Sequence, residues 1–351
     1  MDLSQKRKWI LSISGTVVIL AVIIISYVYS QFQPVDSTAV QKVKIEIPPG
    51  STPTKIASIL KEHQLIKSEW AFKLYLEYKG DASKLQAGSY QLSKQMSISE
   101  IVQQFVSGNV VLDTVRFTIP EGYTILQIAD KLSKEGIVNK ENFLKLAKEG
   151  NFNYDFIKAI PNNANIQYRL EGYLFPDTYV VKKGATEEEI INMMLHQFQK
   201  EWKPEWTKVL QNQKMSIHQA VTLASIVERE VSVAKERPIV SGVFYNRLNN
   251  KWKLQSCATV QFVLGKQKDR LTFADLAIKN PYNTYINDGL PPGPISNPGI
   301  EAIKAAIFPA KHDYFFFVTK KDGSGEHYFS KTFAEHQKYD SDSRLSLKGN
   351  W

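Results

Sequence analysis

The sequence lacks most of the residues and motifs that mark metal and cofactor enzymes. Cys257 is the single cysteine in 351 residues, so no internal disulfide and no thiolate metal cluster can form. Its histidines show no HExxH or comparable spacing, and no G-x-G-x-x-G or G-x-x-x-x-G-K-[ST] pattern occurs. We therefore expect no metal and no cofactor. The six histidines are His63, His196, His218, His312, His327 and His336.

The chain also lacks a long block of basic residues, although its formal net charge is +9. A dispersed positive charge suits anionic surroundings in general and gives little support for nucleic acid as a partner. The hydrophobic fraction of 43% is high enough to build sizeable cores. A length of 351 residues has room for a membrane segment and two or three compact units.

One long uncharged stretch is present, at residues 9–30. Its 22 residues can cross about 30 Å of hydrocarbon at about 1.5 Å per residue. Lys6, Arg7 and Lys8 precede it, which predicts a cytoplasmic tail at 1–8 and an extracytoplasmic remainder of the chain. A cleaved signal peptide is the competing interpretation, but the apolar run is longer than a typical h-region and no A-x-A site follows. Outside the cytoplasm, cell-wall polymers, lipids and exported proteins are the available substrates.

An internal repeat follows a polar linker at 31–42. Residues 47–66, IPPGSTPTKIASILKEHQLI, align with residues 119–138, IPEGYTILQIADKLSKEGIV. Each copy predicts a strand, a Pro/Gly turn and two helices, and each continues into a second strand-like stretch and a helix entered through Glu-Ile. We place the first copy in a domain at 43–108. The pattern I-P-x-G-x-T-x-x-x-I-A-x-x-L resembles the LysM module, which binds the N-acetylhexosamine backbone of cell-wall glycans. Alternatively, these residues only set turns, with Thr52 and Thr124 capping helices.

The sequence also places an acid, Glu228, on the apolar face of a predicted helix. Ser216 and Gln219 form an S-x-x-Q capping box, which predicts a helix start. At about 100° per residue, Glu228 falls within the apolar arc, Thr222 lies on the polar side and Glu230 lies at the boundary. A carboxyl buried in this way either pairs with a cation, for which Arg237 and Arg247 are candidates, or gains a raised pKa and can donate a proton.

The stretches that follow carry groups suited to holding a sugar. Residues 241–265 predict a helix and then a strand-like segment, and residues 280–299 form a Pro/Gly-dense loop rich in amides and aromatics. Residues 314–330 predict a β-hairpin turning at 322–325, followed by a helix at 331–340. His327 is expected to have a structural role.

Five motifs in order resemble the endolytic murein transglycosylases of the YceG-like family: LEGYLFPDTY (170–179), LASIVERE (223–230), VFYNRL (243–248), LQS-ATVQ (254–261) and PYNTY through GLPPGPISNPG (281–299). The resemblance implies an α+β fold: one transmembrane helix, a LysM-like βαα subdomain, and a catalytic domain at 109–351 containing the second repeat copy. It also implies cleavage of peptidoglycan strands between N-acetylmuramic acid and N-acetylglucosamine, leaving 1,6-anhydro ends and terminating strand elongation.

The resemblance places the catalytic acid at Glu228. Expected substrate contacts are Glu230, Glu171, Asn246, Arg247, Gln255, Ser256, Tyr282, Asn283, Tyr285 and Asn297. Many members carry an acid where this chain has Cys257. Expected partners are glycan strands and, through the machinery of elongation and division, peptidoglycan synthases. Two alternatives stay open: a muramidase that uses water, and a non-catalytic wall-binding scaffold.

Overall fold

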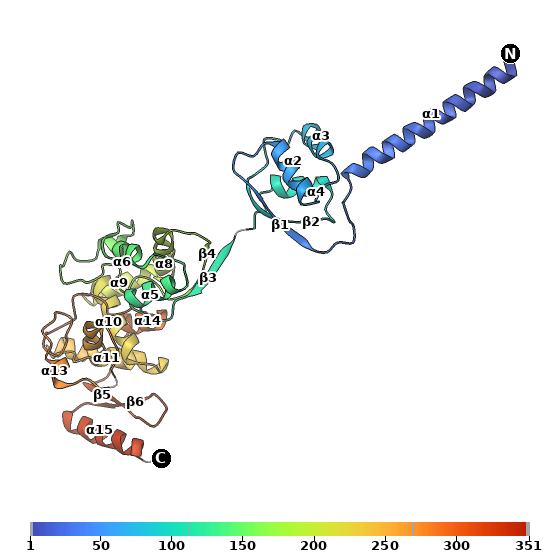
Figure 1. Cartoon of the computed structure of the whole chain (residues 1–351). Coiled ribbons are helices and arrows are strands. Elements are labelled where there is room, and N and C mark those ends of the chain that lie inside the picture. Colours follow the sequence, from blue (N-terminus) through green and yellow to red (C-terminus); the bar gives the residue numbers. More distant parts are fainter. Residues whose placement is uncertain (1–2, 112, 269, 349–351) are drawn as a thin grey trace. The chain divides into compact units, whose positions relative to one another are not determined.

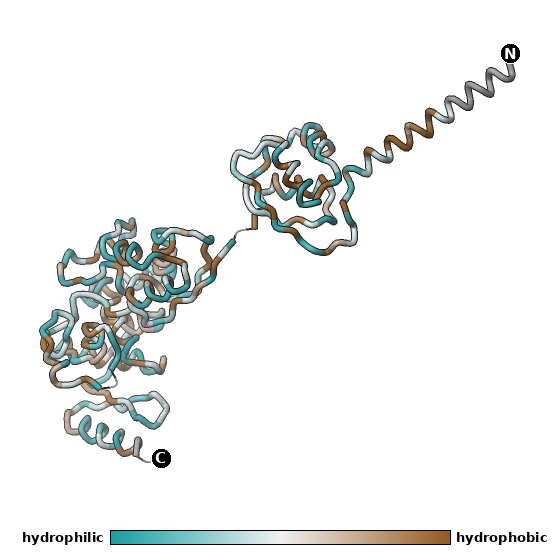
Figure 2. Tube along the Cα trace, in the orientation of Figure 1, coloured by the Kyte–Doolittle hydropathy of each residue, from teal (hydrophilic) through white to brown (hydrophobic). Residues whose placement is uncertain are grey.

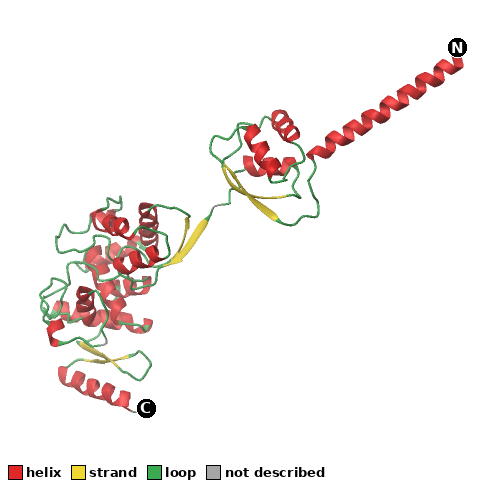
Figure 3. Cartoon of the chain, viewed as in Figure 1, coloured by secondary structure: helices red, strands yellow, loops and turns green. Residues whose placement is uncertain are grey.

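A computed structural model describes residues 3–111, 113–268 and 270–348, and the chain divides into two compact units, residues 1–113 and 114–351. Figure 3 shows a mixed α+β structure in which helices predominate. The predicted cytoplasmic tail at 1–8 lies partly outside the described residues.

The first unit begins with a long helix, α1 (Leu3–Phe32). Within it, residues 14–32 form a segment long and apolar enough to cross a membrane by length and composition, and Figure 2 shows this hydrophobic run in brown. The rest of the unit packs three helices against an antiparallel strand pair. Its elements are β1 (Lys42–Ile47), α2 (Pro53–Glu62), α3 (Glu69–Lys79), β2 (Gly88–Ser93) and α4 (Ile98–Val106).

The second unit opens with the same order of elements (Figure 1). These are β3 (Thr114–Thr118), α5 (Ile125–Lys134), α6 (Lys140–Glu149), α7 (Asp155–Lys158), β4 (Thr178–Lys182) and α8 (Glu187–Glu201). In both copies the two strands pair antiparallel. Thr52 and Thr124 cap α2 and α5 through their side chains, as the capping interpretation of the repeat predicts. The short helix α7 is an insertion in the second copy.

The remaining elements include a central helix, α10, which packs against α9, α11, α12 and α14, whereas the C-terminal hairpin packs against α11 and α15. They are α9 (Pro204–Asn212), α10 (Ile217–Glu230), the 3₁₀ turn η1 (Ala234–Glu236), α11 (Arg237–Asn249), α12 (Cys257–Leu264), α13 (Phe273–Leu276), α14 (Ile300–Ile307), β5 (Phe316–Thr319), β6 (His327–Ser330) and α15 (Phe333–Lys348). The predicted C-terminal hairpin is confirmed by the antiparallel pairing of β5 and β6, and the predicted closing helix corresponds to α15.

One predicted element is wrong. The strand-like segment after residue 254 is the helix α12. Its β-branched residues favour a strand, but Ser256 occupies the N-cap position and Gly265 ends the helix in the left-handed conformation, at φ +67°. The Ser256 side chain makes no capping bond, and the Ala258 amide in the first turn donates to Glu230 instead, while Gly265 ends the helix despite the strand-favouring composition between them.

Candidate active site

The site is built at the C-terminal end of α10. The predicted capping box is present, because the Ser216 side chain accepts from the Gln219 amide and the Gln219 side chain accepts from the Ser216 amide. The helix is buried on more sides than the sequence predicted, and Thr222 is only 1% exposed. The Thr222 hydroxyl donates to the His218 carbonyl within the helix, which satisfies it without water. The expectation that Thr222 faces solvent is therefore wrong.

Glu228 lies where its helical phase predicted, with 6% of its side chain exposed. Its Oε1 accepts a hydrogen bond from Nη2 of Arg237 at 2.8 Å. Its Oε2 accepts from the backbone N–H of Gly299 at 3.0 Å, at the start of α14. Of the two arginines considered as partners, Arg237 forms the ion pair.

These surroundings act on the protonation of Glu228 in opposite directions. Burial raises the pKa of Glu228 above its ordinary value, whereas the Arg237 charge and the Gly299 hydrogen bond lower it, and the net shift is upward. A carboxyl of this kind holds a proton at higher pH than an exposed one. It also has donors in place to stabilise the carboxylate once the proton has left.

Glu230 has a separate environment two residues further on. Its Oε1 accepts from the Ser256 hydroxyl at 2.5 Å and from the Ala258 amide at 3.3 Å. Both donors belong to the start of α12, where backbone N–H groups lack partners within the helix. Glu230 therefore fastens α12 to the end of α10, and this contact with Ser256 unites two of the predicted site residues.

Glu171 and Asn297 form a second buried pair in the same unit. The Asn297 amide donates to Glu171 at 3.0 Å and to the Tyr123 carbonyl at 2.9 Å, and Glu171 accepts from the Ile125 amide. Burial raises the pKa of Glu171 to about 8. The pair holds the turn before α5 against the loop that leads to α14.

Several predicted substrate contacts are instead committed to the protein interior. Asn283 and Asn297 are 0% exposed, and both amide hydrogens of Asn283 go to the carbonyls of residues 276 and 278. Arg247 is buried and donates to the carbonyls of residues 315 and 254, and Asn246 donates to those of residues 312 and 314. These side chains hold loops in place, and the donor groups named here are engaged with backbone carbonyls in this conformation.

Of the predicted substrate contacts, Gln255 is the exposed one, and it lies just before α12 beside Cys257. Gln255 is exposed, with a positive φ of 50°, and Cys257 is exposed with its Sγ 3.1 Å from the Tyr285 hydroxyl. Tyr282 is buried, and its ring lies 5.0 Å from that of Phe262.

A cavity of about 300 Å³ lies beside this region, and its lining includes Glu171, Arg229, Tyr168, Gln167, Gln261 and Phe262. Within the described residues, no group of three or more His, Cys, Asp or Glu side chains could hold a metal ion. Sequence reasoning missed Gly299 as the donor to Glu228 and Glu121 as a second acid, 3.6 Å from Nη2 of Arg237. The signal in the sequence was that Glu121 aligns with Pro49, so that the two copies of the repeat differ at this position.

Comparisons with known proteins agree with this architecture. The model of the YceG-like family matches residues 45–342. The chain belongs to the YceG-like family. A relative from Bacillus subtilis named endolytic murein transglycosylase is 40% identical over 323 residues, covering 89% of this chain and 88% of the relative.

Two further matches extend the YceG-like assignment. A relative of the same name from Streptococcus pneumoniae is 32% identical over 337 residues, and the match covers 89% of this chain and 60% of that protein. A crystal structure titled as a YceG-like protein from Listeria monocytogenes is 38% identical, with a TM-score of 0.59, and the match covers 85% of this chain and 99% of that one.

Proposed function

We propose that this YceG-like protein is a membrane-anchored lytic transglycosylase, a lyase that cleaves peptidoglycan strands internally between N-acetylmuramic acid and N-acetylglucosamine. The relatives named endolytic murein transglycosylase support the reaction class. The single observation that carries the proposal is the enclosed carboxyl of Glu228, held between the Arg237 guanidinium and the Gly299 amide. A buried acid with a raised pKa, placed beside fixed donors, suits a group that must first give up a proton and then take one back.

The proposed reaction uses Glu228 twice. Its proton passes to the glycosidic oxygen as the bond to C1 of the muramic acid breaks and an oxocarbenium-like centre develops. The C6 hydroxyl oxygen of the same sugar then bonds to C1, and its proton returns to Glu228. The product is a 1,6-anhydro end, and no external water is consumed. Because the attacking oxygen belongs to the substrate, proximity contributes to the rate.

Arg237 and the Gly299 amide have a defined part in this cycle. Between the two proton transfers Glu228 is an anion in a largely buried position, which is costly without partners. The ion pair at 2.8 Å and the backbone hydrogen bond at 3.0 Å stabilise that anion. Preorganised donors of this kind need no rearrangement when the charge appears.

The membrane helix, the first unit and the start of α12 are proposed to bring the active site to peptidoglycan strands. The apolar helix α1 anchors the protein in the cell membrane, with the N-terminus cytoplasmic and the chain after α1 outside. The first unit binds the N-acetylhexosamine backbone in the manner of a LysM module, and the enzyme acts on nascent strands beside the synthases that extend them, so that cleavage terminates elongation. Gln255, just before α12, and Tyr285, whose hydroxyl lies 3.1 Å from Cys257 Sγ at the start of that helix, are the proposed sugar contacts.

The experiment is product analysis of glycan strands treated with the full-length protein in detergent, comparing wild type, Glu228→Gln and Glu230→Gln. We expect wild type to give 1,6-anhydro ends by mass spectrometry, and Glu228→Gln to give no product while retaining its fold, because the amide keeps the shape but not the proton. Glu301→Gln is the matched control, since Glu301 is an exposed acid of α14 paired with Lys304.

The outcomes separate the alternatives. Reducing muramic ends without the anhydro product would identify a muramidase that uses water. Intact strands with every variant, wild type included, would identify a non-catalytic wall-binding scaffold. Loss of folding in Glu228→Gln would mean that the ion pair with Arg237 is structural.

A further inference from the structure

The active-site arginine is shared between two acids. Nη2 of Arg237 lies 2.8 Å from Oε1 of Glu228 and 3.6 Å from Oε2 of Glu121. The Arg237 side chain is 10% exposed, that of Glu228 is 6% exposed and that of Glu121 is 47% exposed. Nε of Arg237 is buried and has no acceptor among the described residues. The position of this guanidinium therefore depends on the two carboxylates.

Glu121 reaches the site from the turn between β3 and α5. A Cβ added to Gly299 would overlap the Glu121 carboxylate, so Glu121 lies against the residue whose amide donates to Glu228. The next residue along the turn, Gly122, accepts a hydrogen bond from Arg229 through its carbonyl. The turn thus forms one wall around the catalytic carboxyl.

The repeat shows that the turn itself does not require an acid. In the first copy the equivalent residue is Pro49, yet Gly50 has φ +75° and Gly122 has φ +76°. The same backbone turn therefore forms with proline or with glutamate at this position. The glutamate occurs in the copy that lies next to Glu228.

We propose that Glu121 is a positioning residue of the active site, which shares Arg237 with Glu228 and so keeps the catalytic carboxyl able to hold its proton. This inference rests on the proposed role of Glu228 as the acid. An exclusive ion pair with an arginine would favour the ionised form of Glu228 and make it a poor proton donor. A second carboxylate on the same guanidinium gives the trio a net charge of −1, which favours the uptake of one proton.

Glu228 is the more enclosed of the two acids, with 6% of its side chain exposed against 47% for Glu121. Burial removes water from the Glu228 carboxyl and so favours its neutral, protonated form. Two acids in unequal environments divide the roles of charged and protonated partner. The negative charge of Glu121 raises the pKa of Glu228, in addition to the effect of burial.

The charged groups around Glu228 come from several elements. Arg237 (α11) and Arg229 (α10) lower its pKa and Glu121 raises it. On α14, Glu301 and Lys304 pair with each other, and α12 contributes no charged side chain. Glu230 is engaged with Ser256. On α9, Glu205 and Lys208 are exposed.

The test is the pH profile of strand cleavage by the full-length protein in detergent. Because Glu228 must be protonated, activity falls as pH rises through its pKa. We expect Glu121→Gln to move this alkaline limb to lower pH by about half a unit or more, which is roughly a threefold loss on the limb, with near wild-type activity below it. Glu121→Asp should recover part of the shift, and Glu301→Gln should leave the limb unmoved.

Two results would overturn the inference. One is an alkaline limb in Glu121→Gln that coincides with that of wild type. The other is a loss of more than tenfold at every pH, which would give Glu121 a direct part in the chemistry. Either result can occur while Glu228→Gln is inactive, so it leaves the proposed function intact. Full activity of Glu228→Gln would instead remove the proposed function.

Discussion

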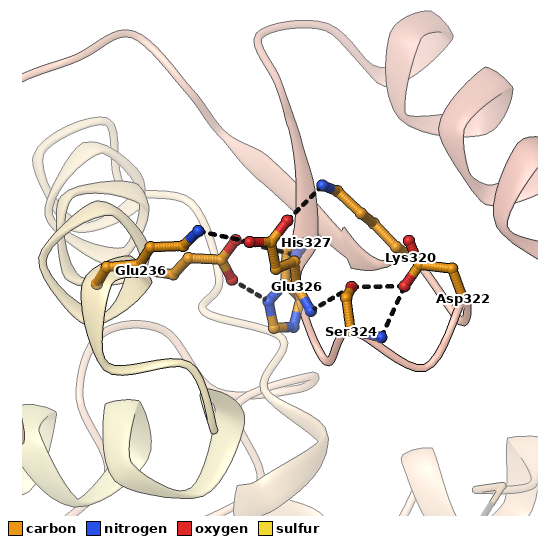
Figure 4. A network of polar contacts seen from close by, with 7 residues as sticks. Glu236, Lys320, Asp322, Ser324, Glu326 and His327 are labelled. Carbon is orange, nitrogen blue, oxygen red and sulfur yellow. Dashed lines mark hydrogen bonds and ion pairs between the residues drawn. The ribbon is translucent and has the colours of Figure 1, made fainter.

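Glu236 and His327 form a buried pair that joins the residue before Arg237 to the C-terminal hairpin, with Nδ1 of His327 2.8 Å from Oε2 of Glu236. The backbone N–H of His327 donates to the other oxygen of the same carboxylate. Next to this pair, Glu326 contacts Lys320 (Figure 4). Glu326 also forms an ion pair with Lys235. The hairpin is therefore held against the start of α11, whose first residue, Arg237, forms the ion pair with Glu228.

Replacing Glu236 by alanine should destabilise the second unit. The side chains of Glu236 and His327 are 7% and 5% exposed, and leaving a buried hydrogen-bonding group without its partner typically costs about 1–3 kcal/mol. Chemical denaturation measures this loss. Lys235→Ala, which breaks only the exposed contact with Glu326, is the control and should change stability little. Equal losses in the two variants would contradict the importance of burial here.

Gly122 and Gly50 occupy equivalent turns of the repeat, but only Gly122 lies beside Glu228. Substituting each by alanine distinguishes the cost of backbone strain from an effect on the active site. Both have φ near +75°, where a Cβ costs about 1–2 kcal/mol. A Cβ on Gly50 would meet nothing within 4 Å, whereas one on Gly122 would lie 3.6 Å from both Glu228 Cγ and Arg229 Cδ. We expect Gly50→Ala and Gly122→Ala to lose similar stability by denaturation, but only Gly122→Ala to slow strand cleavage. Equal cleavage rates would show that a methyl group in van der Waals contact with Glu228 and Arg229 does not displace the catalytic carboxyl.

Local signals in the sequence predicted much of this arrangement. The capping residues Ser216 and Thr124 define helix starts, and a period of 3.6 residues is enough to place Glu228 on a buried face. The choice of Arg237 over Arg247 could not be made in this way. Both lie on α11, and which one faces Glu228 depends on the packing of that helix.

The other site features that the sequence did not predict depend on contacts between residues far apart in the chain. Glu121 lies 107 positions before Glu228, and only the folded chain brings its turn to Arg237. Asn283 and Asn297 suggested sugar contacts because amides bind hydroxyls, but amides equally satisfy backbone carbonyls inside a loop-rich region. Residue type alone does not distinguish the two uses.

Glu171 should make the stability of the second unit fall as pH rises. Burial raises the pKa of Glu171 to about 8 from an ordinary value of 4.5. The unfolded chain therefore loses this proton at lower pH than the folded chain does. The resulting stabilisation is fully present below about pH 4.5 and is lost progressively up to about pH 8.

Glu171→Gln removes this titration. The decline of unfolding free energy between pH 5 and 8, which we expect to be of the order of a few kcal/mol in wild type, should become shallower in the variant. Denaturant titrations across this pH range measure both slopes, with Glu301→Gln as the control for loss of an exposed acid. A variant that declines as steeply as wild type would mean that Glu171 is ionised in the folded protein.

Cys257 gives a chemical probe of the proposed substrate face. The thiol is exposed at the first residue of α12, next to Ser256 and within 3.1 Å of the Tyr285 hydroxyl. Partial burial raises the pKa of the Cys257 thiol, so maleimide labelling should accelerate as pH rises above neutral, because the thiolate is the reactive form. A bulky label there should block the start of α12 and abolish strand cleavage. Cys257→Ser, which has no thiol, should stay active and resist the reagent. Glycan strands added before the reagent should slow labelling if they occupy this face; unchanged labelling, or a labelled enzyme that still cleaves, would place the bound strand elsewhere.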